Sequence, residues 1–176
     1  HVGIVFPAYS FLDPRKYALS AVANLLGGSM SSRLFQKIRE EMGMAYSIYT
    51  YPSTYVGCGT FAVYAGVSPK NGHAVLDETL KQLDLLCRDG VAEKEFREAK
   101  NQLRGSYLLG LESPGSRMQS MGRGQLHLDR CMTPEETVAK IEAVTIESVN
   151  AVAQRIFTNA PCISVVGKQA ETYIKE

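Results

Sequence analysis

Two runs of alternating residues constrain the fold of this chain more than any other feature. Residues 45–51 and 59–65 each form two alternating sets of side chains that would point to opposite faces of a strand. In the first run Tyr46 and Ile48 belong to one set and Ser47 to the other. A period of two residues is the pattern of a β-strand that has one buried face. Pro52 and Gly57 lie between the runs, so the sequence predicts an antiparallel hairpin with a loop longer than the tightest turns.

The hydrophobic pattern changes to helical spacing after residues 68–69 (Ser-Pro). Apolar residues recur at three- and four-residue steps over residues 75–87 and again over residues 96–111, which predicts two helices. Residues 133–136 (Thr-Pro-Glu-Glu) combine a capping box with proline at the first helical position, a strong signal for a helix start. Residues 117–128 are less clearly patterned.

Further elements are expected on both sides of these segments. Residues 2–6 and 162–166 are apolar runs that predict buried strands near the two ends of the chain. Residues 17–26 predict a buried helix, and a second helix should end at Gly43, since glycine commonly follows a helix C-terminus. We therefore expect one α+β domain, residues 1–176, with a mainly antiparallel sheet backed by helices.

Composition excludes several classes of partner. The 176 residues are 45% hydrophobic, enough for a sizeable core, and the formal net charge is only +1. We therefore expect no nucleic-acid binding and no membrane association. The first residue is His1 rather than Met, which predicts that the chain is a piece of a longer protein.

The four cysteines do not form a metal-binding or disulfide pattern. They lie far apart, without a C-x-x-C pair, among apolar neighbours in the sequence. This pattern predicts buried, reduced thiols and a cytoplasmic protein. The residues are Cys58, Cys87, Cys131 and Cys162.

The sequence lacks the residues that a hydrolytic zinc site requires. Such a site needs three protein ligands, and neither His73 nor His127 has a second histidine one helical turn away. His1, the third histidine, is equally isolated, so all three are expected at surface or capping positions. Residues 27–32 are rich in glycine and serine but lack the lysine of a phosphate-binding loop. We therefore expect this chain to bind no metal and no other cofactor.

Residues 25–66 resemble the second, non-zinc half of the pitrilysin/insulinase family of zinc peptidases. The resemblance rests on a Gly-Gly turn at 27–28, Ser-Ser-Arg-Leu-Phe at 31–35, Ile-Arg at 38–39, Gly43, and Ala-Tyr-Ser at 45–47. It extends over nearly the whole chain and is strongest to the short bacterial members. The fold it implies is similar to one half of mitochondrial processing peptidase and of LuxS-like metallohydrolases.

The resemblance implies that Arg39 and Tyr46 are the catalytic residues of this half. In the family, zinc is bound by a homologous partner half, and the two halves together hydrolyse unfolded peptides. We expect Tyr46 to donate to the oxyanion and Arg39 to hold the peptide. The residues alone leave other roles open, since Arg39 could only complement the helix dipole, worth about 0.3–1 kcal/mol, and Tyr46 could only fill the core.

Other residues near this motif have simpler expected roles. Arg33 lies at a helix start, where its charge is unfavourable for the dipole, so we interpret it as a structural ion-pair partner. The hairpin tyrosines are expected to pack rather than to bind a ligand: Tyr49, Tyr51, Tyr55 and Tyr64. Glu40 and Glu41 make the turn after Arg39 more acidic than is usual in the family.

Two functions are compatible with the sequence. The chain could be half of a peptidase, or a non-catalytic scaffold or peptide-binding subunit of the same family. Arg39 and Tyr46 favour the peptidase, because a scaffold has no need for a donor directed at an oxyanion. The isolated half could also associate with itself as a homo-oligomer, because its cavity-facing surface would be exposed.

Overall fold

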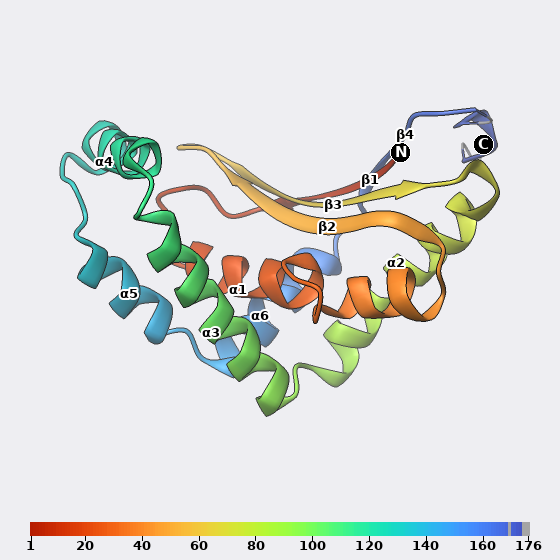
Figure 1. The fold of residues 1–176 in the computed structure, drawn as a ribbon, viewed down its shortest axis with the longest axis horizontal. Coiled ribbons are helices and arrows are strands. Elements are labelled where there is room, and N and C mark those ends of the chain that lie inside the picture. The colour runs from red at the N-terminus through yellow and green to blue at the C-terminus, as the bar shows by residue number, and fades with distance from the viewer. Residues whose placement is uncertain (169, 174–176) are drawn as a thin grey trace.

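A four-stranded antiparallel sheet is covered on one face by helices (Figure 1). The computed structural model describes residues 1–168 and 170–173. The strand order is β2-β3-β1-β4, so β2 and β4 are the two edges. The strands are β1 (Val2–Ala8), β2 (Ala45–Thr54), β3 (Gly59–Val67) and β4 (Cys162–Val165). The α-helices are α1 (Lys16–Gly27), α2 (Gly72–Asp89), α3 (Glu93–Gly110), α4 (Pro114–Leu128), α5 (Pro134–Glu142) and α6 (Ile146–Phe157). Three shorter helical segments are η1 (Phe35–Glu41), η2 (Pro69–Asn71) and η3 (Ala170–Tyr173). This architecture confirms the predicted α+β class.

The central hairpin is the predicted one, extended by several residues. β2 and β3 pair from Ala45 opposite Val67 to Thr54 opposite Gly59. Gly59 is required there, because a Cβ atom at this position would lie 1.9 Å from the Tyr9 carbonyl oxygen. The end of the hairpin therefore packs directly against the chain that leaves β1.

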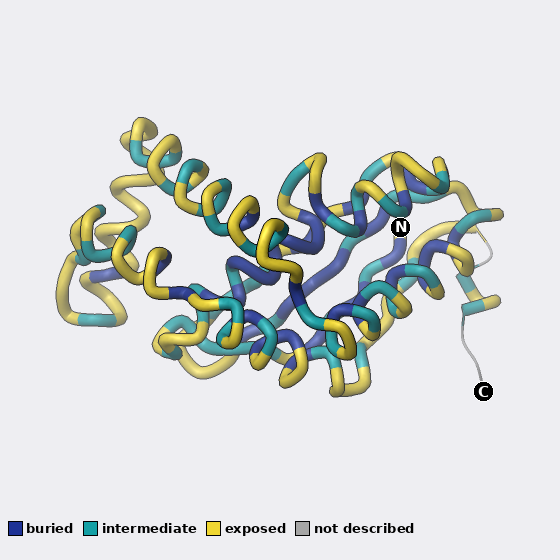
Figure 2. Tube along the Cα trace, turned by 90° about the horizontal axis from the view of Figure 1, so that it is seen from below, coloured by how far each residue is buried: buried dark blue, intermediate teal, exposed yellow. Residues whose placement is uncertain are grey.

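The core lies between the sheet and the helices. Val2, Ile4 and Phe6 alternate along β1 as buried residues, while their neighbours are less buried. Leu19 and Leu26 of α1 are fully buried against this face. Figure 2 shows the buried positions along the middle of the molecule and the exposed ones toward its two ends.

Two helices begin at capping boxes. At α5 the Thr133 hydroxyl accepts from the Glu136 amide (3.2 Å), and the Glu136 carboxylate accepts from the Thr133 amide (2.8 Å). The same reciprocal pair joins Thr145 and Ser148 at α6. The helix start predicted from residues 133–136 is confirmed.

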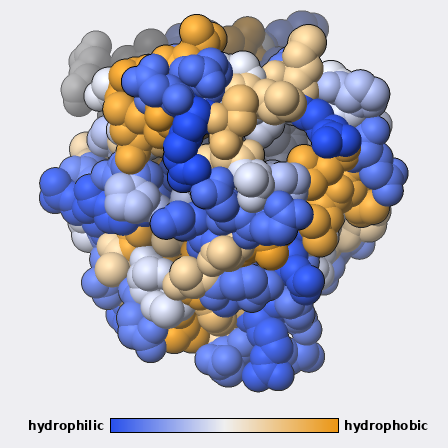
Figure 3. All heavy atoms as spheres, turned by 90° about the vertical axis from the view of Figure 1, so that its left-hand side faces the viewer, coloured by the Kyte–Doolittle hydropathy of each residue, from blue (hydrophilic) through white to orange (hydrophobic). Residues whose placement is uncertain are grey.

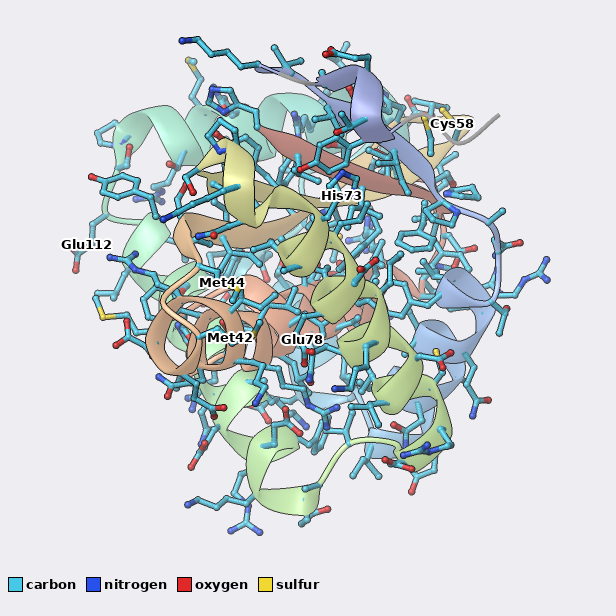
Figure 4. The ribbon with its side chains drawn as sticks, turned by 90° about the vertical axis from the view of Figure 1, so that its right-hand side faces the viewer. Met42, Met44, Cys58, His73, Glu78 and Glu112 are labelled. Atoms are coloured by element: carbon cyan, nitrogen blue, oxygen red, sulfur yellow. The ribbon has the colours of Figure 1, made fainter. Side chains whose placement is uncertain are left out.

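The predicted burial of β4 and of the cysteines is wrong. β4 forms, but Cys162, Ile163 and Ser164 are exposed because this strand is an edge of the sheet. Cys58 lies in the hairpin loop, exposed to solvent (Figure 4), and Cys131 lies in the loop after α4. Only Cys87 is partly buried, and burial raises the pKa of its thiol. Apolar neighbours in sequence do not bury a residue that lies in a loop or on a sheet edge.

None of the helices within residues 1–168 and 170–173 is both long and apolar enough to cross a lipid bilayer.

Leu26→Ala tests the role of α1 in the core. Leu26 is 0% exposed, so the substitution should lower the free energy of unfolding by about 2–5 kcal/mol, through lost burial and a residual cavity. The matched control is Leu109→Ala on α3, because Leu109 is 67% exposed and its loss should change stability by less than about 0.5 kcal/mol. Urea denaturation measures both, and equal effects would contradict the assigned core.

Candidate active-site contribution

The junction between η1 and β2 departs from regular structure. η1 is wound as a π-helix, a rare form that often occurs at functional sites. η1 ends at Glu41, and Gly43 follows two residues later with a φ of 63°, in the left-handed region that glycine adopts without strain. The Met44 amide donates back to the Ile38 carbonyl oxygen over 3.1 Å, which closes the helix end. The predicted end of this helix at Gly43 is confirmed.

A β-bulge at the start of β2 determines how Tyr46 is presented. Ala45 pairs with Val67 and Ser47 pairs with Gly66, so Tyr46 is the extra residue between two consecutive pairs. Bulges commonly re-aim a side chain next to a functional site. Tyr46 is 87% exposed, whereas Ala45 and Ile48 on the same strand are buried. Tyr46 therefore does not fill the core of this chain.

Arg39 lies in the last turn of η1 with its guanidinium over the Phe35 ring. The Cζ atom is 4.7 Å from the ring centroid, and Nε is 4.0 Å from the Glu40 carboxylate. Its side chain is 43% exposed. Phe35 lies four residues before Arg39, a spacing that places both on one helix face. This i, i+4 spacing could have revealed the contact from sequence, but the sequence analysis missed it.

Arg39 and Tyr46 both face solvent, on either side of the Gly43 turn. Within the described part of the chain, no hydrogen bond or ring contact joins them, and neither side chain donates a hydrogen bond. Both groups are therefore available to a ligand or partner.

The junction is anchored to the rest of the domain on both sides of Gly43. Met42 and Met44 pack against the core cluster, and Figure 4 shows them beside the loop that leads into β2. The Asn71 side-chain amide donates to the Met44 carbonyl oxygen over 3.3 Å. These contacts fix the backbone from which Arg39 and Tyr46 extend.

The acidic turn after Arg39 is partly neutralised. Lys37 donates to the Glu41 carboxylate over 2.7 Å, and this hydrogen bond raises the pKa of the Lys37 amine. Glu40 is the acidic group nearest to Arg39, at the limit of ion-pairing distance. The extra acidity predicted from Glu40 and Glu41 is therefore smaller than their sequence suggests.

Arg33 has the structural role predicted for it. Its guanidinium donates through two nitrogens to the Glu95 carboxylate, with one distance of 2.6 Å, and to the Gly90 carbonyl oxygen over 3.1 Å. The ion pair joins the start of the η1 segment to α3. Arg33 is thus committed to the fold and unavailable to substrate.

The tyrosines of the hairpin pack on one another rather than in the core. The Tyr49 and Tyr64 rings stack with centroids 4.8 Å apart, and Tyr51 lies 5.9 Å from Tyr49. Tyr49 and Tyr51 are both exposed, while Thr50 between them is buried. The cluster therefore lies on the sheet face that the helices leave uncovered.

The residues do not fit a hydrolytic zinc ion. Within residues 1–168 and 170–173, no three side chains from His, Cys, Asp and Glu come together as a set that could hold a metal. His1, His73 and His127 are all exposed and lie in different elements.

Comparison with known proteins gives the family. The sequence family described as "Peptidase M16 inactive domain" matches residues 1–103. An uncharacterized zinc protease of Streptomyces coelicolor is 40% identical over 167 residues, which cover 95% of this chain and 36% of the relative. The chain therefore belongs to the peptidase M16 family, as its inactive domain, and the resemblance found in the sequence is confirmed.

Solved structures show the same fold. The peptidase M16 inactive domain from Pseudomonas fluorescens is 20% identical, with a TM-score of 0.76 over 88% of this chain and 38% of that chain. A chain in Complex III2 from Candida albicans is 19% identical, with a TM-score of 0.83 over 93% of this chain and 41% of that chain. The chain spans 35–41% of the length of six bacterial relatives that are 37–40% identical to it.

Arg33→Met tests the structural role of the ion pair. The pair is three-quarters buried (side chains 22% and 28% exposed), so its loss should cost about 1.5–3 kcal/mol of unfolding free energy, as for hydrogen bonds to charged groups. A double-mutant cycle with Glu95→Gln should show coupling between the two residues. Arg88→Met is the control, because the exposed pair of Arg88 with Asp89 should contribute nothing measurable. Additive effects of the two substitutions at 33 and 95 would contradict the assignment.

Proposed function

We propose that this chain is the non-zinc half of a zinc endopeptidase that cleaves unfolded peptides. It supplies Tyr46 and Arg39 to a reaction centre whose zinc is held by a separate homologous half, in the same polypeptide or in a partner subunit. The observation that carries the proposal is the η1–β2 junction. There a π-helix, a left-handed glycine and a β-bulge present two solvent-exposed donors, the Arg39 guanidinium and the Tyr46 phenol.

The chemistry of the two donors suits peptide hydrolysis. The reaction passes through a tetrahedral oxyanion, and a preorganised donor to that oxygen is worth about 3–4 kcal/mol. The Tyr46 phenol is a neutral donor on a strand that the sheet holds in place, so it can meet the oxyanion without reorganisation. The Arg39 guanidinium has a rigid fork of donors that suits the backbone carbonyls of a bound peptide.

The uncovered sheet face supports the same proposal. Monomeric domains rarely leave a large aromatic or apolar surface open unless it binds something. Here the stacked Tyr49, Tyr51 and Tyr64 lie on the face opposite the helices, and β2 is also an edge of the sheet. An extended peptide could lie across this face or pair with the free edge of β2.

The names of the relatives agree with this assignment. The Streptomyces coelicolor relative is called a zinc protease, and this chain corresponds to about a third of its length. We infer that the remaining length of such a protein includes the metal-binding half.

Tyr46→Phe in the assembled peptidase tests the function directly. Removal of one oxyanion donor should lower kcat by roughly 100- to 1000-fold. Zinc content and thermal stability should stay unchanged, because the Tyr46 side chain is exposed and makes no hydrogen bond to any described residue. Cleavage of a quenched fluorescent peptide measures the rate.

Tyr55→Phe is the matched control, since Tyr55 is an exposed tyrosine in the loop between β2 and β3 and lies outside the Tyr49, Tyr51 and Tyr64 cluster. It should leave kcat unchanged. A Tyr46→Phe enzyme with full activity would contradict the proposed donor. An assembled wild-type protein that binds zinc and peptide but cleaves nothing would instead indicate a scaffold.

A further inference from the structure

A cavity at the opposite end of β2 lies far from Arg39 and Tyr46. It has a volume of about 470 Å³ and lies between the first turns of α1, the end of α3, α4 and the end of β2. Pro52 and Thr54 of β2 line it, and Thr54 lies eight residues beyond Tyr46 along the strand. At the rise of an extended strand this separation is roughly 25 Å. The volume is that of a small-molecule site.

The cavity explains the unusual pattern of α4. Ser116, Gln119, Ser120 and Arg123 line the cavity, at a spacing that places them on one helix face. The apolar Met118, Met121 and Leu126 are exposed instead. Figure 3 faces this end of the molecule and shows hydrophobic areas separated by hydrophilic ones. The face of α4 that carries these four polar residues is therefore the face that lines the cavity.

The lining carries positive charge without a compensating carboxylate. Lys16 and Arg123 both line the cavity, and none of its lining residues is acidic. Neither side chain forms an ion pair with any residue that the structure describes; Lys16 donates to the Phe11 carbonyl oxygen over 2.7 Å. The nearby Glu136 is engaged by Arg130 at 2.8 Å and by the capping box of α5.

Lys16 is held in a partly desolvated setting. Its Nζ atom lies 3.9 Å from the centroid of the Phe11 ring and 5.4 Å from that of Tyr17. Burial lowers the pKa of this amine. An anion bound beside it would favour the charged form of the amine and accept from the N–H groups that the Phe11 carbonyl leaves free.

We propose that this cavity binds a carboxylate attached to an apolar body, with Lys16 and Arg123 as the anion-binding residues. A guanidinium binds a carboxylate through two parallel hydrogen bonds, and the lysine adds a second charge. Phe11, Tyr17, Tyr107 and Leu128 form apolar walls for the rest of the ligand. The carboxylate could belong to a free amino-acid derivative or to the C-terminus of a peptide. This proposal does not depend on the function proposed for Arg39 and Tyr46.

Calorimetry on the 176-residue chain tests the site with defined probes. N-acetyl-phenylalanine should bind, and its amide, which lacks the charge, should not. Lys16→Met and Arg123→Gln should each weaken binding of the acid by about tenfold or more, because each removes a charge-assisted hydrogen bond. Lys94→Met, an exposed lysine of α3 far from the lining, is the control and should leave binding unchanged. Thermal unfolding of each variant verifies that it is folded.

The tripeptide Gly-Gly-Phe distinguishes the two sources of carboxylate. Tighter binding of the tripeptide than of N-acetyl-phenylalanine would assign the site to peptide C-termini, and equal binding would assign it to small organic acids. Equal affinity for acid and amide would overturn the proposal. Binding of inorganic phosphate without binding of either carboxylate, or undiminished binding by both variants, would overturn it as well.

Discussion

The burial of one sheet face under α1 and α6 is the constraint on which the rest of the structure depends. Leu19 and Leu26 of α1 and Val152 and Ile156 of α6 are all buried in one cluster with the strands. Because β-strand side chains alternate between faces, this packing fixes which residues of the hairpin point away from the helices. A slip of one residue would bury Tyr49 and Tyr51 and expose Ile48 and Thr50. The same packing fixes the register between β2 and β3, which places the β-bulge at Tyr46.

The candidate site lies at the border of this core, where the backbone departs from regular helix and strand. Met42 and Met44 pack inward on either side of Gly43, so the turn is anchored even though Arg39 and Tyr46 extend into solvent. An exposed phenol and an exposed guanidinium contribute little to the stability of an isolated domain. In the proposed function, a second surface brings a substrate to these two groups, which a fixed backbone holds in place. This explains how a domain can lack a metal-binding cluster among its described residues and still belong to a peptidase family.

The sequence predicted most of the fold because periodicity reports burial directly. The hairpin, the helix end at Gly43 and the capping box at residues 133–136 were all predicted from local patterns, and Arg33 was correctly assigned as a structural ion-pair residue. Three features could not be predicted in this way. The exposure of β4 and Cys162 depends on which strand is an edge, which is a property of the whole sheet, and Cys58 and Cys131 are exposed because they lie in loops. The bulge at Tyr46 depends on pairing with β3. The weak pattern of residues 117–128 arises because α4 lines a cavity with polar residues, so no apolar stripe marks its inner face.

The proposed function requires the Tyr46 phenol to lie beside the oxyanion while a peptide is being cleaved. A crystal structure of the assembled peptidase with a phosphinic peptide, which mimics the tetrahedral intermediate, measures this directly. We expect the Tyr46 hydroxyl at about 2.7–3.1 Å from the phosphinyl oxygen that represents the oxyanion, with Arg39 at a backbone carbonyl of the inhibitor. A Tyr46 hydroxyl that remains in solvent, beyond hydrogen-bonding reach of the inhibitor, would contradict it.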